Sequence, residues 1–199
     1  MLDLENTEKV LFTNNSKSLL AKLMSEEDIT IQHRNVQTAS FDVINRILIV
    51  PIWKSMSSDL YDLFMGHEVG HALYTPDDED VLEDAINRSN KDFVNVVEDA
   101  RIEKKMKKSF PGLRGPMFRG YQELQNADFF GIQNRELSSL SFIDRINVFY
   151  KSTMSDATAK SVFSDEELYF VNKVGKTETF SEVASVAQEI FELLQEKSE

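Results

Sequence analysis

Residues 65–76 have the sequence MGHEVGHALYTP and carry two of the three histidines of the chain, four residues apart, with a glutamate directly after the first. An apolar stripe at helical spacing runs through this stretch and contains both histidines: Leu60, Phe64, His67, His71 and Tyr74. We therefore predict a helix that begins near residues 57–58, two serines that can cap it, and that ends at residues 75–76. Gly66 and Gly70 each cost about 1 kcal/mol relative to alanine inside a helix, which predicts that another element packs close to the backbone there.

Two histidines one helical turn apart hold their imidazoles close enough to bind one metal ion. Zinc takes nitrogen and oxygen ligands in a tetrahedral arrangement, and a catalytic zinc site keeps one position open for water. Glu68 is rotated by about 100° from His67 around the helix, so it leaves the ligand face and can still reach a water on the metal. The competing interpretation is a helix with two core or surface histidines. On an apolar stripe, however, His67 and His71 would then leave ring nitrogens without partners.

The third ligand is expected to be a carboxylate, because the chain has no cysteine and only one further histidine. Glu98 is the preferred candidate, since it interrupts an inward-facing row at four-residue steps: Val94, Ile102 and Met106. Pairing of Glu98 with Arg101, three residues on, is the alternative. Asp99 is the alternative third ligand. If it does not bind the metal, it is expected to accept a hydrogen bond from the Nδ1–H of a ligating histidine. Two further residues are candidates for such support: Asn95 and Glu103.

The remaining elements follow from local patterns. Residues 29–53 are rich in β-branched side chains and predict two or three strands, the last of which, ILIV, is closed by Pro51 and is expected at a sheet edge. Helices are predicted over residues 5–24 and 92–109, and the stretch FPGLRGPMFRGY at 110–121 is expected to be a long loop. Later helices are expected to begin at capping boxes: Ser141, Ser164 and Thr179.

Composition limits the class of protein. The 199 residues are 41% hydrophobic and 28% charged, as in a globular protein with one domain. The net charge of −12 argues against a nucleic-acid binder, which needs a basic surface. No stretch has the roughly 20 apolar residues of a membrane helix, and the N-terminus lacks a signal-like apolar run. We therefore expect a cytoplasmic protein that does not bind membranes.

The two motifs GHEVGHALYTP and NVVEDARIE together resemble the gluzincin branch of the zinc metallopeptidases. More specifically, they resemble metallopeptidase-like domains of bacterial and phage proteins, some of which also carry a von Willebrand A domain. The similarity covers about residues 40–121 and implies His67, His71 and Glu98 as Zn²⁺ ligands, with Glu68 as the catalytic acid/base. The stretch between His71 and Glu98 is long and acidic, and the second motif lacks the Asn-Glu pair of some gluzincins, so the choice between Glu98 and Asp99 stays open.

The resemblance implies a zincin-like α+β fold, with a small N-terminal sheet whose edge strand lies beside the motif helix and holds an extended peptide or protein substrate. The rest is expected to be mainly α-helical. We treat residues 1–199 as a single domain, with the motif core at about 40–121. The helical part at about 139–199 would lead into a further domain, such as a von Willebrand A domain, in a longer chain. Tyr121 is the first candidate for stabilising the oxyanion, ahead of Arg114 and Arg119.

The function that we expect is a zinc-dependent peptidase in which Glu68 activates a metal-bound water. Two other hypotheses remain: a catalytically silent metal-binding domain that acts through protein contacts, and a metal-free helical interaction module. A purely structural zinc would need a fourth protein ligand in place of Glu68. One basic cluster stands out in this acidic chain, and it either binds a substrate carboxylate or an acidic partner or is a solvated helix end: Lys104, Lys105, Lys107, Lys108, Arg114 and Arg119.

Overall fold

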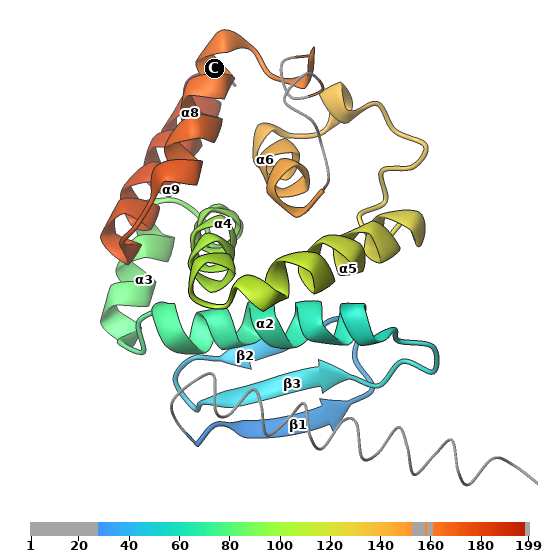
Figure 1. Ribbon diagram of the computed structural model, residues 1–199. Coiled ribbons are helices and arrows are strands. Elements are labelled where there is room, and N and C mark those ends of the chain that lie inside the picture. The colour runs from blue at the N-terminus through green and yellow to red at the C-terminus, as the bar shows by residue number, and fades with distance from the viewer. Residues whose placement is uncertain (1–27, 153–157, 159–160, 198–199) are drawn as a thin grey trace, which may run out of the picture.

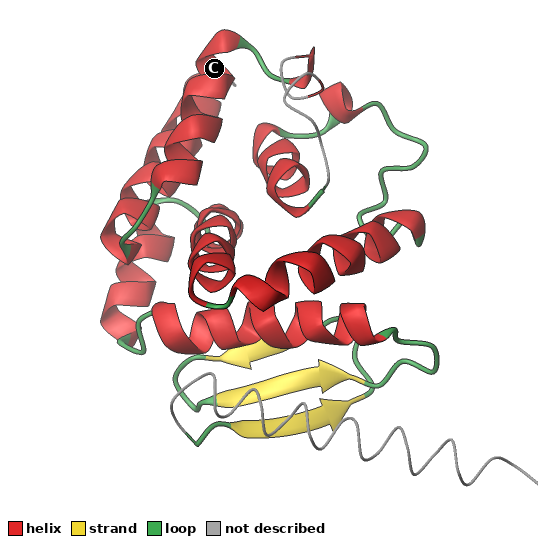
Figure 2. Cartoon of the chain, in the orientation of Figure 1, coloured by secondary structure: helices red, strands yellow, loops and turns green. Residues whose placement is uncertain are grey.

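The computed structural model describes residues 28–152, 158 and 161–197. These residues form seven α-helices, two short 3-10 helices and one three-stranded sheet (Figures 1 and 2). The sheet lies on one side of the motif helix α2 (Ser58–Tyr74), and the other helices lie on the opposite side of α2. This arrangement confirms the predicted α+β class. The helices expected over residues 5–24 lie outside the described residues.

The sheet has the order β1-β3-β2, with β1 (Thr30–Arg34), β2 (Ser40–Asp42) and β3 (Ile47–Pro51). β3 runs parallel to β1 and antiparallel to β2, so the ILIV strand is central and the prediction that it lies at an edge is wrong. A continuous apolar run is typical of a strand with neighbours on both sides, and Pro51 is tolerated because it is the last residue of the strand. Within the described residues, β1 and β2 are the two edge strands, and both contact α2.

Helix α2 begins and ends where its sequence predicts. The Ser57 hydroxyl caps the helix by accepting a hydrogen bond from the Leu60 N–H at 3.0 Å. One face of α2 packs on the sheet in a single apolar cluster, whose buried members are Ile29, Leu48, Val50, Tyr61, Met65, Val69 and Met106. The opposite face therefore remains available for the polar residues of the motif.

Helix α4 (Lys91–Ser109) packs against α2 at Gly70, and the 3-10 helix η1 (Pro111–Leu113), which follows α4, packs against α2 at Gly66. A Cβ atom on Gly70 would lie 2.9 Å from both Ile102 Cδ1 and Met106 Cγ, and one on Gly66 would lie 3.1 Å from Leu113 Cδ1. The prediction that another element packs close to the backbone here is confirmed. The close approach brings the residues of α4 next to the histidine-bearing face of α2.

The stretch at residues 110–121 is mostly helical, so its prediction as a long loop is wrong. It forms the 3-10 helix η1 (Pro111–Leu113) and the first part of α5 (Arg114–Asn126). Pro116 lies in the first turn of α5, where no N–H is needed. A Cβ atom on Gly120 would lie 2.9 Å from Leu63 Cβ and 3.1 Å from a backbone oxygen of α2, so this glycine allows α5 to pack on α2.

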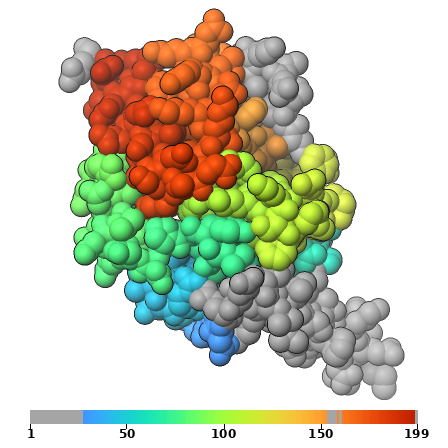
Figure 3. Space-filling view, turned by 60° about the vertical axis from the view of Figure 1, so that its left-hand side comes forward, coloured from blue at the N-terminus to red at the C-terminus, as the bar shows by residue number. Residues whose placement is uncertain are grey.

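The remaining helices enclose α4 from the side away from the sheet. They are α3 (Glu79–Arg88), α6 (Phe142–Lys151), α8 (Asp165–Lys176) and α9 (Phe180–Glu196), with a second 3-10 helix, η2 (Leu137–Ser139). The caps of α6, α8 and α9 are those predicted: Ser141, Ser164 and Thr179. In the space-filling view α9 lies directly against α3 (Figure 3). Among the described residues, no helix combines the length and apolarity needed to span a membrane.

Candidate metal centre

Two imidazoles from α2 and one carboxylate from α4 converge on a common point. His67 Nε2 lies 3.5 Å and His71 Nε2 lies 3.2 Å from the same oxygen, Oδ1 of Asp99. All three atoms lie within 4.8 Å of one another. Ligands about 2.0–2.1 Å from a tetrahedral zinc ion are themselves roughly 3.3 Å apart, so the two measured distances match those of a zinc site.

The other ring nitrogen of each histidine is held by a hydrogen-bond acceptor. His67 Nδ1 lies 3.0 Å from Glu103 Oε1, and His71 Nδ1 lies 2.9 Å from Thr75 Oγ1. Because the Thr75 hydroxyl donates its own hydrogen to Glu98 at 2.6 Å, it accepts from His71. When both imidazoles are neutral, hydrogen on Nδ1 leaves the Nε2 lone pairs directed at Asp99. Three facing acceptor atoms then repel one another unless a metal ion or a proton lies between them.

The charges around this point favour a cation. Burial alone lowers the pKa of His67, but the charge and hydrogen bond of Asp99, the hydrogen bond of Glu103 and the charge of Glu68 together outweigh burial and raise this pKa to about 10. Burial likewise opposes ionisation of Asp99, yet Lys151 and His67 hold the pKa of its carboxyl well below the usual range. The Lys151 Nζ donates to Asp99 Oδ2 at 2.6 Å. One oxygen of Asp99 is thus taken by an ammonium group, and the other faces the two histidines.

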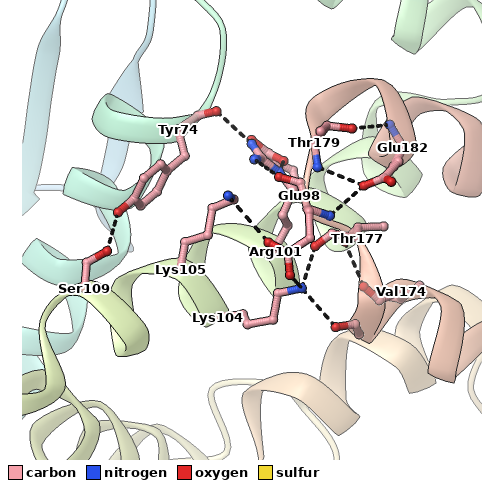
Figure 4. Close-up of polar contacts among 12 residues, drawn as sticks. Tyr74, Glu98, Arg101, Lys104, Lys105, Ser109, Val174, Thr177, Thr179 and Glu182 are labelled. Atoms are coloured by element: carbon pink, nitrogen blue, oxygen red, sulfur yellow. Dashed lines mark hydrogen bonds and ion pairs between the residues drawn. The ribbon is translucent and has the colours of Figure 1, made fainter.

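Glu98 lies outside this cluster. Its carboxylate accepts two hydrogen bonds of 2.7 Å from Arg101, which also donates to the backbone oxygen of Tyr74 at the end of α2 (Figure 4). Glu98 is 2% exposed and Arg101 is 3% exposed, so the pair is buried. The ion pair between Glu98 and Arg101, which the sequence offered as the alternative to metal ligation by Glu98, is therefore the interaction that forms. The structure brings Asp99, and not Glu98, to the histidines, while Glu98 supports His71 through Thr75.

Glu68 is positioned for a role different from that of the ligands. It is 5% exposed, and its carboxylate makes no hydrogen bond with any of the described residues. Burial raises the pKa of Glu68, and the positive charges of His67 and His71 partly offset that rise. A carboxylate with a raised pKa and without donors is a stronger base than a solvated one.

Tyr121 lies near the cluster, but its hydroxyl is already in use. It donates a short hydrogen bond to Glu103 Oε1, the oxygen that also accepts from His67. Burial and the charge of Glu103 raise the pKa of Tyr121 well above its ordinary value, so the phenol stays protonated. Of the other two candidates for the oxyanion, Arg119 pairs with Asp59 at 2.7 Å, and Arg114 donates to a backbone oxygen of α4.

A pocket of about 650 Å³, here called the metal-site pocket, opens beside the cluster. Its wall includes the cluster together with Glu68, Tyr121 and Lys151. The edge strand β2 forms another part of the wall, with its neighbouring residues 38–43. Aromatic and aliphatic side chains line much of the rest, among them Leu82, Ile86, Leu124, Phe129, Phe130 and Phe180. A mostly apolar groove with few convergent polar groups is typical of a ligand site.

Two residues of the site escaped the sequence analysis. Lys151 lies 52 residues after Asp99, at the end of α6, and no local pattern in the sequence connects it with the two motifs. Thr75 was recognised only as part of the helix end. Its spacing of four residues from His71, which places it one turn below that histidine, was the signal that could have identified it.

The arrangement combines three convergent ligand atoms, two supported imidazoles and one unpaired buried carboxylate. These are the elements of a mononuclear metal site with an open position. No protein-family model, no curated protein and no solved structure matches this chain.

Proposed function

We propose that this protein is a zinc-dependent peptidase whose metal ligands are His67, His71 and Asp99. The observation that carries the proposal is the convergence of two Nε2 atoms and one carboxylate oxygen beside the buried, unpaired carboxylate of Glu68. Relationship to the gluzincin-type metallopeptidases is part of the same proposal and rests on the motif residues alone. Asp99 takes the place that the resemblance gave to Glu98.

Zinc, when bound, lowers the pKa of a coordinated water from about 15.7 toward 7 and polarises the carbonyl of the substrate. Glu68 accepts the proton of the water and returns it to the leaving amine, a contribution of typically 10²–10⁴-fold. Glu103 and Thr75 hold His67 and His71 in the tautomer that ligates. Tyr121 keeps Glu103 in place by its hydrogen bond.

The free edge of β2 is the surface on which we place the substrate. It lines the metal-site pocket and offers unpaired backbone groups within the described part of the sheet. An extended peptide can add to such an edge as a further strand. This assignment replaces the one expected for β3, which has neighbours on both sides.

The decisive experiment measures zinc binding and hydrolysis separately. Protein stripped with a chelator is titrated with zinc in a competition assay against a fluorescent chelator. We expect one zinc per chain, and we expect Asp99→Asn to weaken binding at least about 100-fold because a ligand is lost. Glu68→Gln retains the zinc and loses cleavage of a mixed fluorogenic peptide library. Glu83→Gln, an exposed glutamate of α3, is the matched control.

Each outcome decides one part of the proposal. If the wild-type protein binds no zinc, the proposed metal centre is wrong. A zinc-bound protein that cleaves no peptide in the library removes the enzyme and leaves a catalytically silent metal-binding domain. Full hydrolysis by the Glu68→Gln variant removes Glu68 from the mechanism.

A further inference from the structure

A second pocket, of about 420 Å³, lies between α4, α6 and the start of α5. Its wall contains five cationic side chains: Lys104, Lys107, Lys108, Arg114 and Lys151. Of the described residues, Asp99 and Glu103 alone contribute carboxylates to it. We call this cavity the basic pocket. Its excess of positive charge is opposite to the net charge of −12 of the whole chain.

One of these cations is occupied by the fold. Lys104 Nζ donates to the backbone oxygens of Gly175 and Thr177 and to Glu178, at 3.1, 2.6 and 2.8 Å (Figure 4). An ammonium group has three N–H donors, so those of Lys104 are all used. Lys104 therefore ties α4 to the turn between α8 and α9.

The other four cations retain donors for a ligand. Lys107 and Lys151 each make one hydrogen bond to a carboxylate, and Arg114 gives its Nε–H to a backbone oxygen. Lys108 is exposed and makes no ion pair or hydrogen bond with a described residue. Together these four groups can donate several charge-assisted hydrogen bonds to one anion.

A neutral side chain in the same wall gives an independent indication of a ligand. Asn147 Oδ1 is shielded from solvent and has no hydrogen-bond partner among the described residues. Buried polar atoms of this kind normally have a partner, so this oxygen is available to a bound group that has a hydrogen-bond donor. A peptide residue carries an N–H donor close to a carboxylate, and it can satisfy Asn147 and the cations together. Chloride and sulfate offer no such donor.

The basic pocket adjoins the candidate metal centre, because Asp99 and Lys151 line both this pocket and the metal-site pocket. We propose that the basic pocket binds a carboxylate of the peptide substrate, held by Lys107, Lys108, Arg114 and Lys151. This inference rests on the proposed function for the identity of the ligand as a substrate. It makes the protein selective for peptides with a carboxylate near the bond that is cleaved.

The test uses zinc-loaded Glu68→Gln protein and calorimetric titration, so that binding is measured without turnover. Three acetylated peptides are compared: one with a free C-terminus and no acidic residue, one amidated with a single glutamate, and one amidated and uncharged. We expect at least one carboxylate peptide to bind about tenfold or more tightly than the uncharged peptide. The first two peptides distinguish an α-carboxylate from an acidic side chain.

The double variant Lys108→Gln, Arg114→Gln, in the same Glu68→Gln background, should reduce this preference to about threefold or less while zinc affinity stays unchanged. Both residues are exposed, so the fold is retained. Lys54→Gln is the control, since Lys54 is exposed and lines neither pocket. Equal affinity for the three peptides, or an undiminished preference in the double variant, overturns the inference. Loss of hydrolysis in the wild type would instead overturn the proposed function and leave the binding result intact.

Discussion

Replacement of Gly70 by alanine tests whether the close contact between α2 and α4 positions the metal centre. A Cβ atom there would lie 2.9 Å from Ile102 Cδ1 and from Met106 Cγ, and 3.4 Å from Ile102 Cβ. Carbon atoms in favourable contact are about 3.5–4.0 Å apart. Ile102 and Met106 are both 0% exposed, so neither can turn away into solvent. The two helices must therefore separate, or the side chains must leave their preferred rotamers.

The net effect is a balance of two terms. Alanine is favoured over glycine in a helix interior by about 1 kcal/mol. Overpacking a filled core costs typically about 1–3 kcal/mol, and two contacts with fully buried side chains place this site at the upper end. We expect Gly70→Ala to lower the free energy of unfolding by about 2 kcal/mol, measured by urea denaturation in the presence of chelator.

The same displacement should weaken zinc binding. His67 and His71 lie on α2 and Asp99 on α4, so separating the helices moves the ligands apart. We expect a loss of about tenfold in affinity, or about 1.4 kcal/mol. Gly66→Ala is the control, because its Cβ would meet only the flexible end of Leu113 at 3.1 Å. This control should be neutral or up to about 1 kcal/mol more stable. A Gly70→Ala protein with wild-type stability and zinc affinity would refute the packing argument.

Three further predictions concern glutamates that accept hydrogen bonds from other side chains: Glu98, Glu103 and Glu167. Glu98→Gln should lower the free energy of unfolding by about 3 kcal/mol in urea denaturation, because it leaves the buried Arg101 without its carboxylate partner. The zinc affinity of this variant should stay within about tenfold of the wild-type affinity, because Glu98 is not a ligand. Glu103→Gln should weaken zinc binding about 10–100-fold in chelator competition, because the Glu103 carboxylate accepts the hydrogen bond that orients His67. Burial raises the pKa of Glu167, but its hydrogen bonds with Arg145 and the Ser164 N–H, together with the charges of Arg145 and Lys197, outweigh burial and lower this pKa below 4.5. The pair thus stabilises the fold above pH 4.5 and loses this contribution as the pH falls through the folded pKa. Urea midpoints of Glu167→Gln should accordingly depend less on pH in that range.

Helix positions were predictable from the sequence because their signals are local. The caps at Ser57, Ser164 and Thr179 each bond the backbone of the next turn, so no distant residue is needed to identify them. The stretch at residues 110–121 was predicted wrongly because its signal is not local. Gly120 is required by the packing of α5 on α2, and in the sequence a glycine required by helix packing looks the same as a glycine required by a turn.

The order of the strands was beyond local reasoning. A run such as that of β3 shows that a strand is buried, but it does not show which strands flank it. β1 precedes β2 in the chain, yet β3 inserts between them, and this pairing places β2 at the edge beside the metal-site pocket. The edge on which we propose that the substrate binds is thus fixed by pairing over a distance, which hydrophobic patterning does not encode.

The choice between Glu98 and Asp99 shows where sequence reasoning stops at the site itself. Helix α4 has neighbours on several sides, including α2, α6, α8 and α9. Its residues 96–107 are therefore all at least partly buried, and periodicity no longer identifies one inward face. The choice is made by partners on other elements. Arg101 takes both oxygens of Glu98, whereas Lys151 takes one oxygen of Asp99 and leaves the other facing the histidines. A residue 52 positions away thus leaves Asp99 with one oxygen facing the histidines, the oxygen that we propose as a metal ligand, and this selection exists only once α6 has packed against α4.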